Sequence, residues 1–331
     1  MRYSILSLAL LAMTLSGCDM QQDAGVEGAP LPIRIAIPMQ PTSGLALIAR
    51  EQGFFEKRGL AVSYSEYPSG KRALDEGLLA GKADVAFSAE VPIVAAALAG
   101  KDFRVIATTF RASNVNRVIA RTDHGIHIPN DLKGKKVATQ QASAVHFFLH
   151  LFLIENGLST SDIKLSYLKA EELVPALVSG SIDAFSMREP FIGEAKAQLG
   201  DNAIVFSVSG LYQQFDSALV GTPFLQQQPQ AVKRLLLALR DAEDYVRQHP
   251  EEALTMGARI LGVSATDLSH LWENRSLMLA LEQSYLLTLE DISRWLTNEK
   301  LVEDSTPADF LNVIDAGPLQ SLDSKRISLI R

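Results

Sequence analysis

The sequence predicts an α/β protein built as two similar lobes, and three observations predict it. From Ile33 onward, short apolar strand patterns alternate with segments that carry apolar residues at helical spacing. The alternation stops near Thr109 and begins again at Lys135. The segments 78–85 and 177–184 share the pattern Leu-x-x-Gly-x-x-Asp, as expected if both lobes follow one plan.

The first run of elements predicts a largely parallel sheet covered by helices. Strands are expected over residues 33–37, 61–67, 84–87 and 103–109. Helices are expected after Ser43, after Gly70 and over residues 91–99, each with a glycine as its C-terminal stop.

The second run repeats this order and is followed by a helical region. Strands are expected over 135–139, 163–168 and 182–185, and helices over 144–156 and 173–179. Helical spacing then continues without strands over 231–248, 251–261, 265–271 and 289–297. Helices without strands cannot build a third α/β lobe, so we expect them to brace the first one.

The N-terminus predicts export. Arg2 precedes an apolar run over residues 5–15, which is about half of the ~20 residues that a membrane-spanning helix needs. Residues 1–17 are therefore interpreted as a cleaved signal peptide.

Cys18, the single cysteine of the chain, follows small residues. The sequence Leu15-Ser16-Gly17-Cys18 resembles the bacterial lipobox, in which cleavage precedes the cysteine and the thiol is lipidated. Residues 18–32 are poor in large apolar side chains and are predicted to form a lipidated tether. A resemblance to enteric lipoproteins at Asp19 favours the inner membrane. We expect the protein on the periplasmic side, anchored to the membrane by its N-terminal lipid.

Composition and motifs exclude several other classes of function. The net charge of −7 disfavours nucleic acid as a partner, because phosphate binding needs a basic face. The sequence has no Gly-x-Ser-x-Gly nucleophile turn, no Walker-type phosphate loop and no dinucleotide fingerprint. We therefore predict no catalytic residues and no cofactor.

The order of several short segments identifies a related family. These segments are Gly44-Leu45, Gly53–Leu60, Gly81–Phe87, Asp131–Ala138, Ser143–Phe148, Asp183–Pro190, Pro229–Leu237 and His249–Ala253. Taken together, they resemble the periplasmic solute-binding proteins of the nitrate/sulfonate/taurine transporter family. The resemblance extends from about Ile33 to about Leu322. One departure is Arg188, which stands before Glu189-Pro190 where the family often has an aromatic residue.

The resemblance implies a type II periplasmic-binding fold, in which two lobes meet at a hinge of two crossover strands. The crossovers are expected near 116–121 and 215–222. Lobe 1 is expected over 33–117 plus 219–331, and lobe 2 over 118–218.

The resemblance also implies a function. It favours a sulfonate, nitrate or another small organic anion as ligand and an ABC permease in the inner membrane as partner. We expect a monomer that closes its lobes on the ligand. The alternatives are a pyrimidine-type or amine-type ligand, a sensory lipoprotein and, less favoured, an enzyme similar to pyrimidine synthases of this fold.

The candidate ligand residues follow from a rule for open α/β sheets, in which ligands bind where strands end and helices begin. Free N–H groups and the helix dipole make such points receptive to anions and polar atoms. The rule gives Thr42, Ser43, Ser69, Gly70, Ser88, Ala89, Glu90, Arg111, Ser143, Ala144, His146, Arg188 and Glu189.

Most of these residues also have a purely structural interpretation. Thr42, Ser43 and Ser143 can be simple helix caps, and Glu90 can cap the helix that follows it. Ser88 follows a buried strand and has nothing obvious to cap. Arg111 can be an ion-paired surface residue.

Arg188 is the most informative candidate. A guanidinium binds carboxylate, sulfonate or phosphate as a two-pronged donor. The alternative is a salt bridge between the lobes with Glu90 or Glu189. If both glutamates face the pocket, the ligand is instead an amine or an aromatic nitrogen base.

His146 and His150 have the spacing of two metal ligands on one helix. Phe147 stands where a zinc protease has glutamate, and no third ligand is recognisable. We expect no metal and interpret His146 as a pocket or core histidine.

Overall fold

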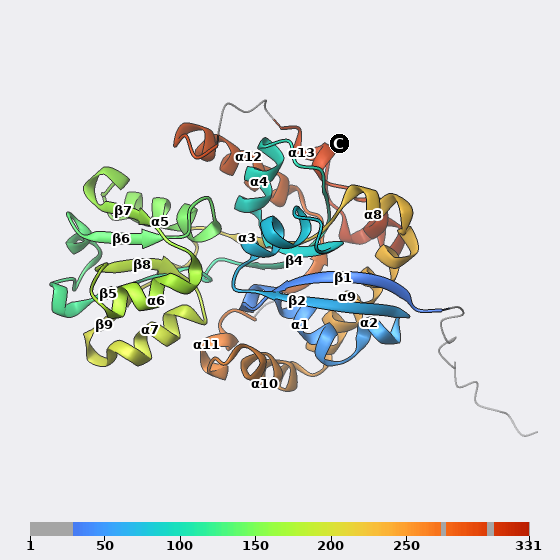
Figure 1. Ribbon diagram of the computed structural model, residues 1–331, viewed down its shortest axis with the longest axis horizontal. Coiled ribbons are helices and arrows are strands. Elements are labelled where there is room, and N and C mark those ends of the chain that lie inside the picture. The colour runs from blue at the N-terminus through green and yellow to red at the C-terminus, as the bar shows by residue number, and fades with distance from the viewer. Residues whose placement is uncertain (1–28, 273–275, 303–307, 331) are drawn as a thin grey trace, which may run out of the picture.

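The computed structural model describes residues 29–272, 276–302 and 308–330, which form two lobes with one sheet each (Figure 1). Cys18, Asp19 and the predicted signal peptide lie outside these residues. The lobe 1 sheet has the order β11 (Leu277–Ala280), β4 (Arg104–Ala112), β10 (Gln214–Val220), β3 (Val85–Ala89), β1 (Leu31–Pro38) and β2 (Leu60–Tyr67). The lobe 2 sheet has the order β7 (Lys164–Tyr167), β6 (Lys136–Thr139), β8 (Ala184–Met187), β5 (Arg117–Arg121) and β9 (Ala203–Phe206). The predicted α/β class is confirmed.

Both sheets are mixed, so the prediction of largely parallel sheets is wrong. Strands β1, β2 and β3 run parallel, as do β6, β7 and β8. Strand β10 is antiparallel to β3 and β4, and β5 is antiparallel to β8 and β9. The reason is the path of the chain, because β5 and β10 are the strands by which it enters each lobe from the other one.

The chain crosses between the sheets through residues 113–116 and 207–213. Both segments precede the predicted crossovers, which turn out to be mostly strands β5 and β10 themselves. Each of these strands therefore begins at the hinge and runs away from it.

The repeated Leu-x-x-Gly-x-x-Asp pattern has the same structural role in both lobes. Gly81 and Gly180 adopt left-handed φ values of 71° and 76°, which end the preceding helix. Asp84 then accepts a hydrogen bond from the Arg34 N–H at 2.8 Å, and Asp183 accepts one from the Lys136 N–H at 2.7 Å. In each lobe, the aspartate thus fixes the start of the neighbouring parallel strand.

Helices cover both sheets. Lobe 2 carries α5 (Ala144–Glu155), α6 (Ala170–Val178) and α7 (Phe191–Leu199). Lobe 1 carries α1 (Gly44–Glu51), α2 (Phe54–Lys57), α3 (Gly70–Arg72), α4 (Glu90–Leu98), α8 (Thr222–Gln227), α9 (Pro229–Gln248), α10 (Pro250–Leu261), α11 (Ala265–Ser269), α12 (Gln283–Asn298), α13 (Phe310–Val313) and α14 (Gly317–Leu322). Helix α9 packs on α1 and α2, and α12 packs on α4. The prediction that the late helices brace lobe 1 is confirmed.

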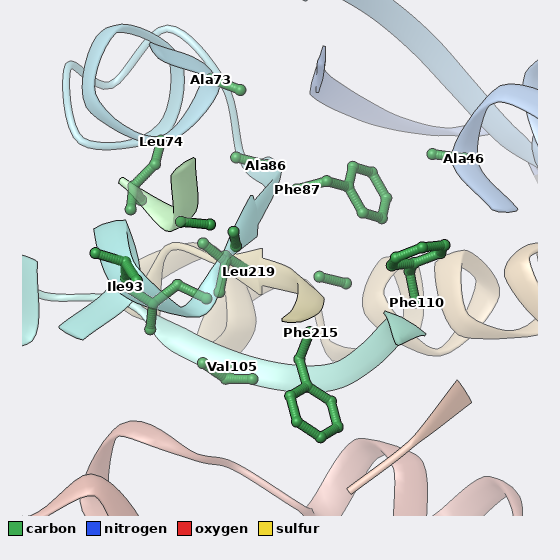
Figure 2. Packing of buried hydrophobic residues seen from close by; sticks show 14 of the residues in the cluster. Ala46, Ala73, Leu74, Ala86, Phe87, Ile93, Val105, Phe110, Phe215 and Leu219 are labelled. Atoms are coloured by element: carbon green, nitrogen blue, oxygen red, sulfur yellow. The ribbon is translucent and has the colours of Figure 1, made fainter. Parts of the chain in front are cut away.

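Apolar side chains of the lobe 1 core cover both faces of three neighbouring strands. Figure 2 shows Phe110, Phe215 and Phe87 on the neighbouring strands β4, β10 and β3, with Leu74 and Ile93 from covering helices. All five side chains are almost completely buried. Burial of a side chain of this size stabilises the fold by about 1.5–3 kcal/mol, so the ends of these strands are held in fixed positions.

No helix within the described ranges is long and apolar enough to cross a membrane.

Candidate functional site

Buried polar side chains gather where the two lobes face each other. With the exception of Arg111, every predicted ligand residue is buried. The group, called the inter-lobe cluster here, comprises Gln40, Thr42, Ser43, Ser69, Ser88, Glu90, Asn116, Gln140, Ser143, Arg188, Gln214 and Asp216. Buried polar groups cost free energy unless they are hydrogen-bonded, so their partners indicate what the cluster can bind.

Asp216 organises the lobe 1 side of the cluster. This carboxylate near the start of β10 accepts hydrogen bonds from Thr42 Oγ1 (2.8 Å), Gln40 Nε2 (3.2 Å) and Gln214 Nε2 (2.6 Å). Gln214 in turn accepts a bond from Asn116 Nδ2 at 2.9 Å. Thr42 is thus bound to Asp216, although the sequence also allowed it to be a simple cap. Burial raises the pKa of Asp216, against the effect of Arg188 and of its three donors.

Glu90 is the first residue of α4 and is completely buried. Its Oε2 accepts the Phe215 N–H at 3.0 Å, while Oε1 has no hydrogen-bond partner among the described residues. Burial and the neighbouring Asp216 raise the pKa of Glu90 well above its usual range.

Arg188 brings the opposite charge from lobe 2. It follows β8 and is 3% exposed, and its Nε is buried without a hydrogen-bond partner. Asp216 and Glu90 act on it electrostatically, but neither forms an ion pair with it in the described part of the chain. Burial lowers the pKa of this guanidinium, against the effect of the two acids. A buried guanidinium without an ion-pair partner makes this position a candidate site for an anion.

Glu189 has a different environment from Glu90, although the sequence offered both as partners of Arg188. It pairs with Arg117 at 3.2 Å and accepts the Gly193 N–H at 2.9 Å, both within lobe 2. Glu189 therefore stabilises the loop after β8 instead of bridging the lobes.

Arg111 takes the structural role that the sequence allowed. It lies near the end of β4 and forms an ion pair with Glu282 at 2.5 Å. The predicted ligand contact of Arg111 thus has no support from this geometry.

Three helices that begin at the cluster have no side-chain cap. Ser43 stands at the N-cap of α1, and its hydroxyl is buried without a partner. Ser143 stands at the N-cap of α5, but its hydroxyl donates to Gln140 O at 2.5 Å. No side chain caps α4 either. No side chain therefore neutralises the positive ends of α1, α4 and α5, although the first N–H of α1, that of Gly44, already donates to Pro41 O.

Ser88 and Gly70 lie in close contact. A side chain at Gly70 would meet the Ser88 backbone at 3.0 Å and its hydroxyl at 3.3 Å. The Ser88 hydroxyl is buried and has no partner among the described residues. The position after β2 therefore requires glycine for close approach, and Ser88 keeps a free hydroxyl group.

The lobes are in direct contact in this arrangement. Gln140 Nε2 donates to Ser69 Oγ at 3.0 Å, and Arg72 forms an ion pair with Glu171. Asn114 Nδ2, in the first crossover, donates to His270 O at 2.7 Å. These contacts hold the two lobes together in the structure.

An aromatic contact also joins the lobes and includes His146. Trp295 of α12 packs against His146, Phe147 and His150 of α5, with ring centroids 5.1, 4.9 and 5.9 Å away. Tyr167 also packs against His146, with ring centroids 5.1 Å apart. Burial lowers the pKa of His146 to about 4. His146 is thus a core histidine at the lobe contact. No group of metal-ligating side chains occurs in the chain as described.

Sequence reasoning missed Gln40, Asn116, Gln140, Gln214 and Asp216. Gln40 lies two positions before Thr42 and Gln140 three positions before Ser143, so the same rule applied to a longer stretch after each strand includes them. Asn116, Gln214 and Asp216 lie at the beginnings of the crossover strands, which the rule for strand ends does not cover. The buried Asp216 within an apolar strand was the available signal.

Two cavities lie outside the cluster. One of 640 Å³ is lined by Glu243, Trp272, Met278, Arg326 and other residues around β11. The second, of 590 Å³, lies between α4 and the segment before α5. In the first cavity, Glu243 forms an ion pair with Arg326 at 2.7 Å. The inter-lobe cluster is the stronger candidate site because several of its buried polar atoms have no partner among the described residues.

The chain is similar to several known proteins. The model of the NMT1/THI5-like family matches residues 40–253, more than half of the chain. The chain is 29% identical over 257 residues to a Bacillus subtilis protein named for binding aliphatic sulfonates, which covers 76% of each chain. An Escherichia coli protein with the same name is 24% identical over 80% of this chain and 83% of its own. The alkanesulfonate-binding protein of Xanthomonas axonopodis pv. citri, solved with MOPS bound, shares the fold with a TM-score of 0.73 and 18% identity. That match covers 87% of this chain and 99% of the other.

The pKa of His146 predicts an acid-sensitive fold. Because the folded-state pKa of about 4 lies below the unfolded value of about 6.5, the stability that neutral His146 allows is complete above pH 6.5. It is lost as the pH falls toward 4. The variant His146→Phe should therefore lose about 2 kcal/mol less unfolding free energy between pH 7 and pH 5 than the original chain. Urea unfolding at both pH values measures this difference. The exposed His127→Gln variant is the control, and equal losses in all three proteins would contradict the prediction.

Proposed function

This chain belongs to the NMT1/THI5-like family, and from that premise we propose that it is an extracytoplasmic solute-binding protein of an ABC uptake transporter. In this proposal, the two lobes close on a small organic anion, a sulfonate or carboxylate, and deliver it to a membrane permease. The observation that carries the proposal is the buried guanidinium of Arg188, which faces the other lobe without an ion-pair partner in the described residues.

An anion is the group that this position lacks. An isolated buried charge costs several kcal/mol, and an oppositely charged partner with good geometry offsets most of that cost. A sulfonate or carboxylate supplies two oxygens to the guanidinium fork. The uncapped N-termini of α1 and α5 come from different lobes. They add N–H donors that favour negative charge.

Closure follows from the same geometry. An anion bound to Arg188 of lobe 2 and to the helix ends of lobe 1 touches both lobes at once. Such a ligand stabilises the closed state by its differential affinity for that state. The two crossovers provide the hinge, and the contact of Trp295 with His146 and Phe147 forms only when the lobes meet.

Membrane attachment is part of the proposal. A lipidated Cys18 would hold the protein near its permease through a tether of residues 18–32, with Asp19 favouring the inner membrane. Buried acyl chains contribute about 0.8 kcal/mol per methylene, and more than one chain is needed for stable anchoring.

Removal of the guanidinium tests the ligand site. The variant Arg188→Ala should weaken binding of alkanesulfonates by about a hundredfold or more, because it removes a buried charge-assisted contact. The affinity of Arg188→Lys should lie between those of Arg188→Ala and the original chain, since an ammonium group cannot donate two parallel hydrogen bonds as a guanidinium does. Calorimetric titration after a thermal-shift screen of sulfonates, carboxylates and nitrate measures these affinities. The exposed Arg294→Ala variant should bind like the original chain. Unchanged affinity in Arg188→Ala would end the anion assignment.

Truncation of the aromatic contact tests closure. The variant Trp295→Ala removes packing that only the closed state makes, worth about 0.5–1.5 kcal/mol per aromatic pair. The apparent Kd should rise about tenfold, mainly through faster dissociation. Stopped-flow kinetics measure the rates, and small-angle scattering should show that ligand compacts the protein. Leu287→Ala, an exposed change on the same helix, is the matched control. An unaltered dissociation rate would contradict the role of Trp295.

Loss of the cysteine tests the anchor. The variant Cys18→Ser should move the exported protein from the membrane fraction to the soluble periplasmic fraction, since no acyl chain is attached. Ligand affinity should stay the same, because residue 18 precedes both lobes. Fractionation with mass spectrometry of the N-terminal peptide measures both the location and the modification. An unmodified Cys18 in the original chain would refute lipidation.

A further inference from the structure

The lobe 1 side of the inter-lobe cluster contains two completely buried carboxyl groups, those of Glu90 and Asp216. The Phe215 N–H donates to Glu90 Oε2, and Phe215 immediately precedes Asp216. Arg188 is the cation that acts on both acids. If both acids are ionised, the negative charges of this group therefore outnumber the positive one before any ligand is present.

The donors around the two acids decide which of them keeps its charge. Asp216 accepts hydrogen bonds from three side chains, those of Gln40, Thr42 and Gln214. Glu90 is bonded to backbone N–H groups alone, and its Oε1 is buried without a partner among the described residues. Because donors stabilise the ionised form of a carboxyl group, Asp216 holds its charge and Glu90 is the acid that more readily takes a proton.

An anion without a donor group increases this difference. It adds a negative charge to the same buried cluster, and it offers only lone pairs to Glu90 Oε1. Like charges disfavour the ionised form of an acid. A proton on Oε1 cancels the added charge and turns that oxygen into a hydrogen-bond donor, and donors to an anion form strong, charge-assisted bonds.

We infer that Glu90 takes up a proton from solvent when an anion binds and, as a neutral carboxylic acid, donates its Oε1–H to the anion that Arg188 holds from the other lobe. The inference rests on the proposed function and deepens it, because it makes capture of the anion depend on pH. The Glu90 O–H bond forms on binding and breaks on release. When the lobes open, Glu90 returns to water, and the proton leaves because the pKa of an exposed glutamate is about 4.3.

The surroundings of Glu90 supply no other group suited to take up this proton. Helix α4 packs on β3, β10, α5 and α12, and Arg188 faces it from the loop after β8. The titratable side chains of the four packing elements that are not exposed are those of Asp216, Tyr285, His146 and His150. Burial raises the pKa of the Tyr285 phenol, which therefore stays neutral, and burial lowers the pKa of both histidines, which disfavours their protonation.

Calorimetric titration of the purified full chain measures the proton. The probes are ethanesulfonate, butanesulfonate and nitrate, whose own charge does not change between pH 6 and pH 8. Titrations at pH 7 in buffers of different ionisation enthalpy should show net uptake approaching one proton per bound anion. The affinity should fall by at least about tenfold between pH 6 and pH 8, since full uptake of one proton corresponds to about tenfold per pH unit.

The variant Glu90→Gln removes the titration and keeps the donor. Its amide oxygen can accept the Phe215 N–H, while its NH₂ group takes the place of the Oε1–H. At pH 6 it should bind within about threefold of the original chain, without proton uptake and without the fall in affinity toward pH 8. Glu189→Gln is the matched control, because burial raises the pKa of Glu189 as well, and it should keep the proton uptake.

Thermal unfolding checks that both variants are folded, and the proton count on the original chain decides if Glu90→Gln is not. Anions that bind without net proton uptake would overturn the inference, as would uptake that persists in Glu90→Gln. If Arg188→Ala then still abolishes binding, the proposed function stands without it. Failure of all three anions to bind at any pH overturns both.

Discussion

The site depends on one constraint, which is that the chain passes between the two sheets twice. Strands β1, β3, β6 and β8 end at the boundary between the lobes, and the helices that follow them begin there. The returning strands β5 and β10 must start at that same boundary and run antiparallel to their neighbours. The boundary thus receives helix N-termini from one set of strands and the side chains of Asn116, Gln214 and Asp216 from the other. The meeting of helix N-termini and buried polar side chains at this boundary is a consequence of the topology.

In the proposed function, the burial of these charges links ligand binding to closure. Arg188, Glu90 and Asp216 are almost completely buried in the structure. Asp216 is compensated by three donors. Glu90 has a partner on only one oxygen, and Arg188 has an unpaired Nε. In the proposed open state, water would solvate these groups. Closure without a ligand would remove that water and put no other hydrogen-bond partner in its place. A ligand that offers matching groups replaces the lost water, so that the closed state becomes lower in free energy than the open state. Closure then depends on the ligand.

Much of the architecture was predictable because it follows from local patterns. Alternating strands and helices, glycine stops and the repeated Asp84 and Asp183 are signals carried by short segments. The antiparallel direction of β5 and β10 was not predictable in this way, because an apolar run has the same pattern in either direction. The direction depends on which lobe the chain has just left.

The same distinction explains which site residues were found. Ser88, Glu90, Ser143 and Arg188 follow predicted strands, and the structure places them in the inter-lobe cluster. Asp216 was missed because its hydrogen-bond partners include residues as distant in sequence as Gln40, and no local pattern connects such residues. The contact of Trp295 with α5 was missed for a related reason, since an aromatic residue at helical spacing is normally interpreted as core.

Glu90 and Glu189 show how structure separates residues that sequence treats alike. Both follow buried strands, and both were candidate partners of Arg188. The carboxylate of Glu189 is bonded within its own lobe to Arg117 and to the Gly193 N–H, so it needs no partner from a ligand. Glu90 is held by the backbone of Phe215 with one oxygen and keeps the other free. Arg188 acts on Glu90 electrostatically, but no ion pair joins the two among the described residues. Of the two glutamates, Glu90 is thus the one that keeps an unpaired oxygen within the inter-lobe cluster.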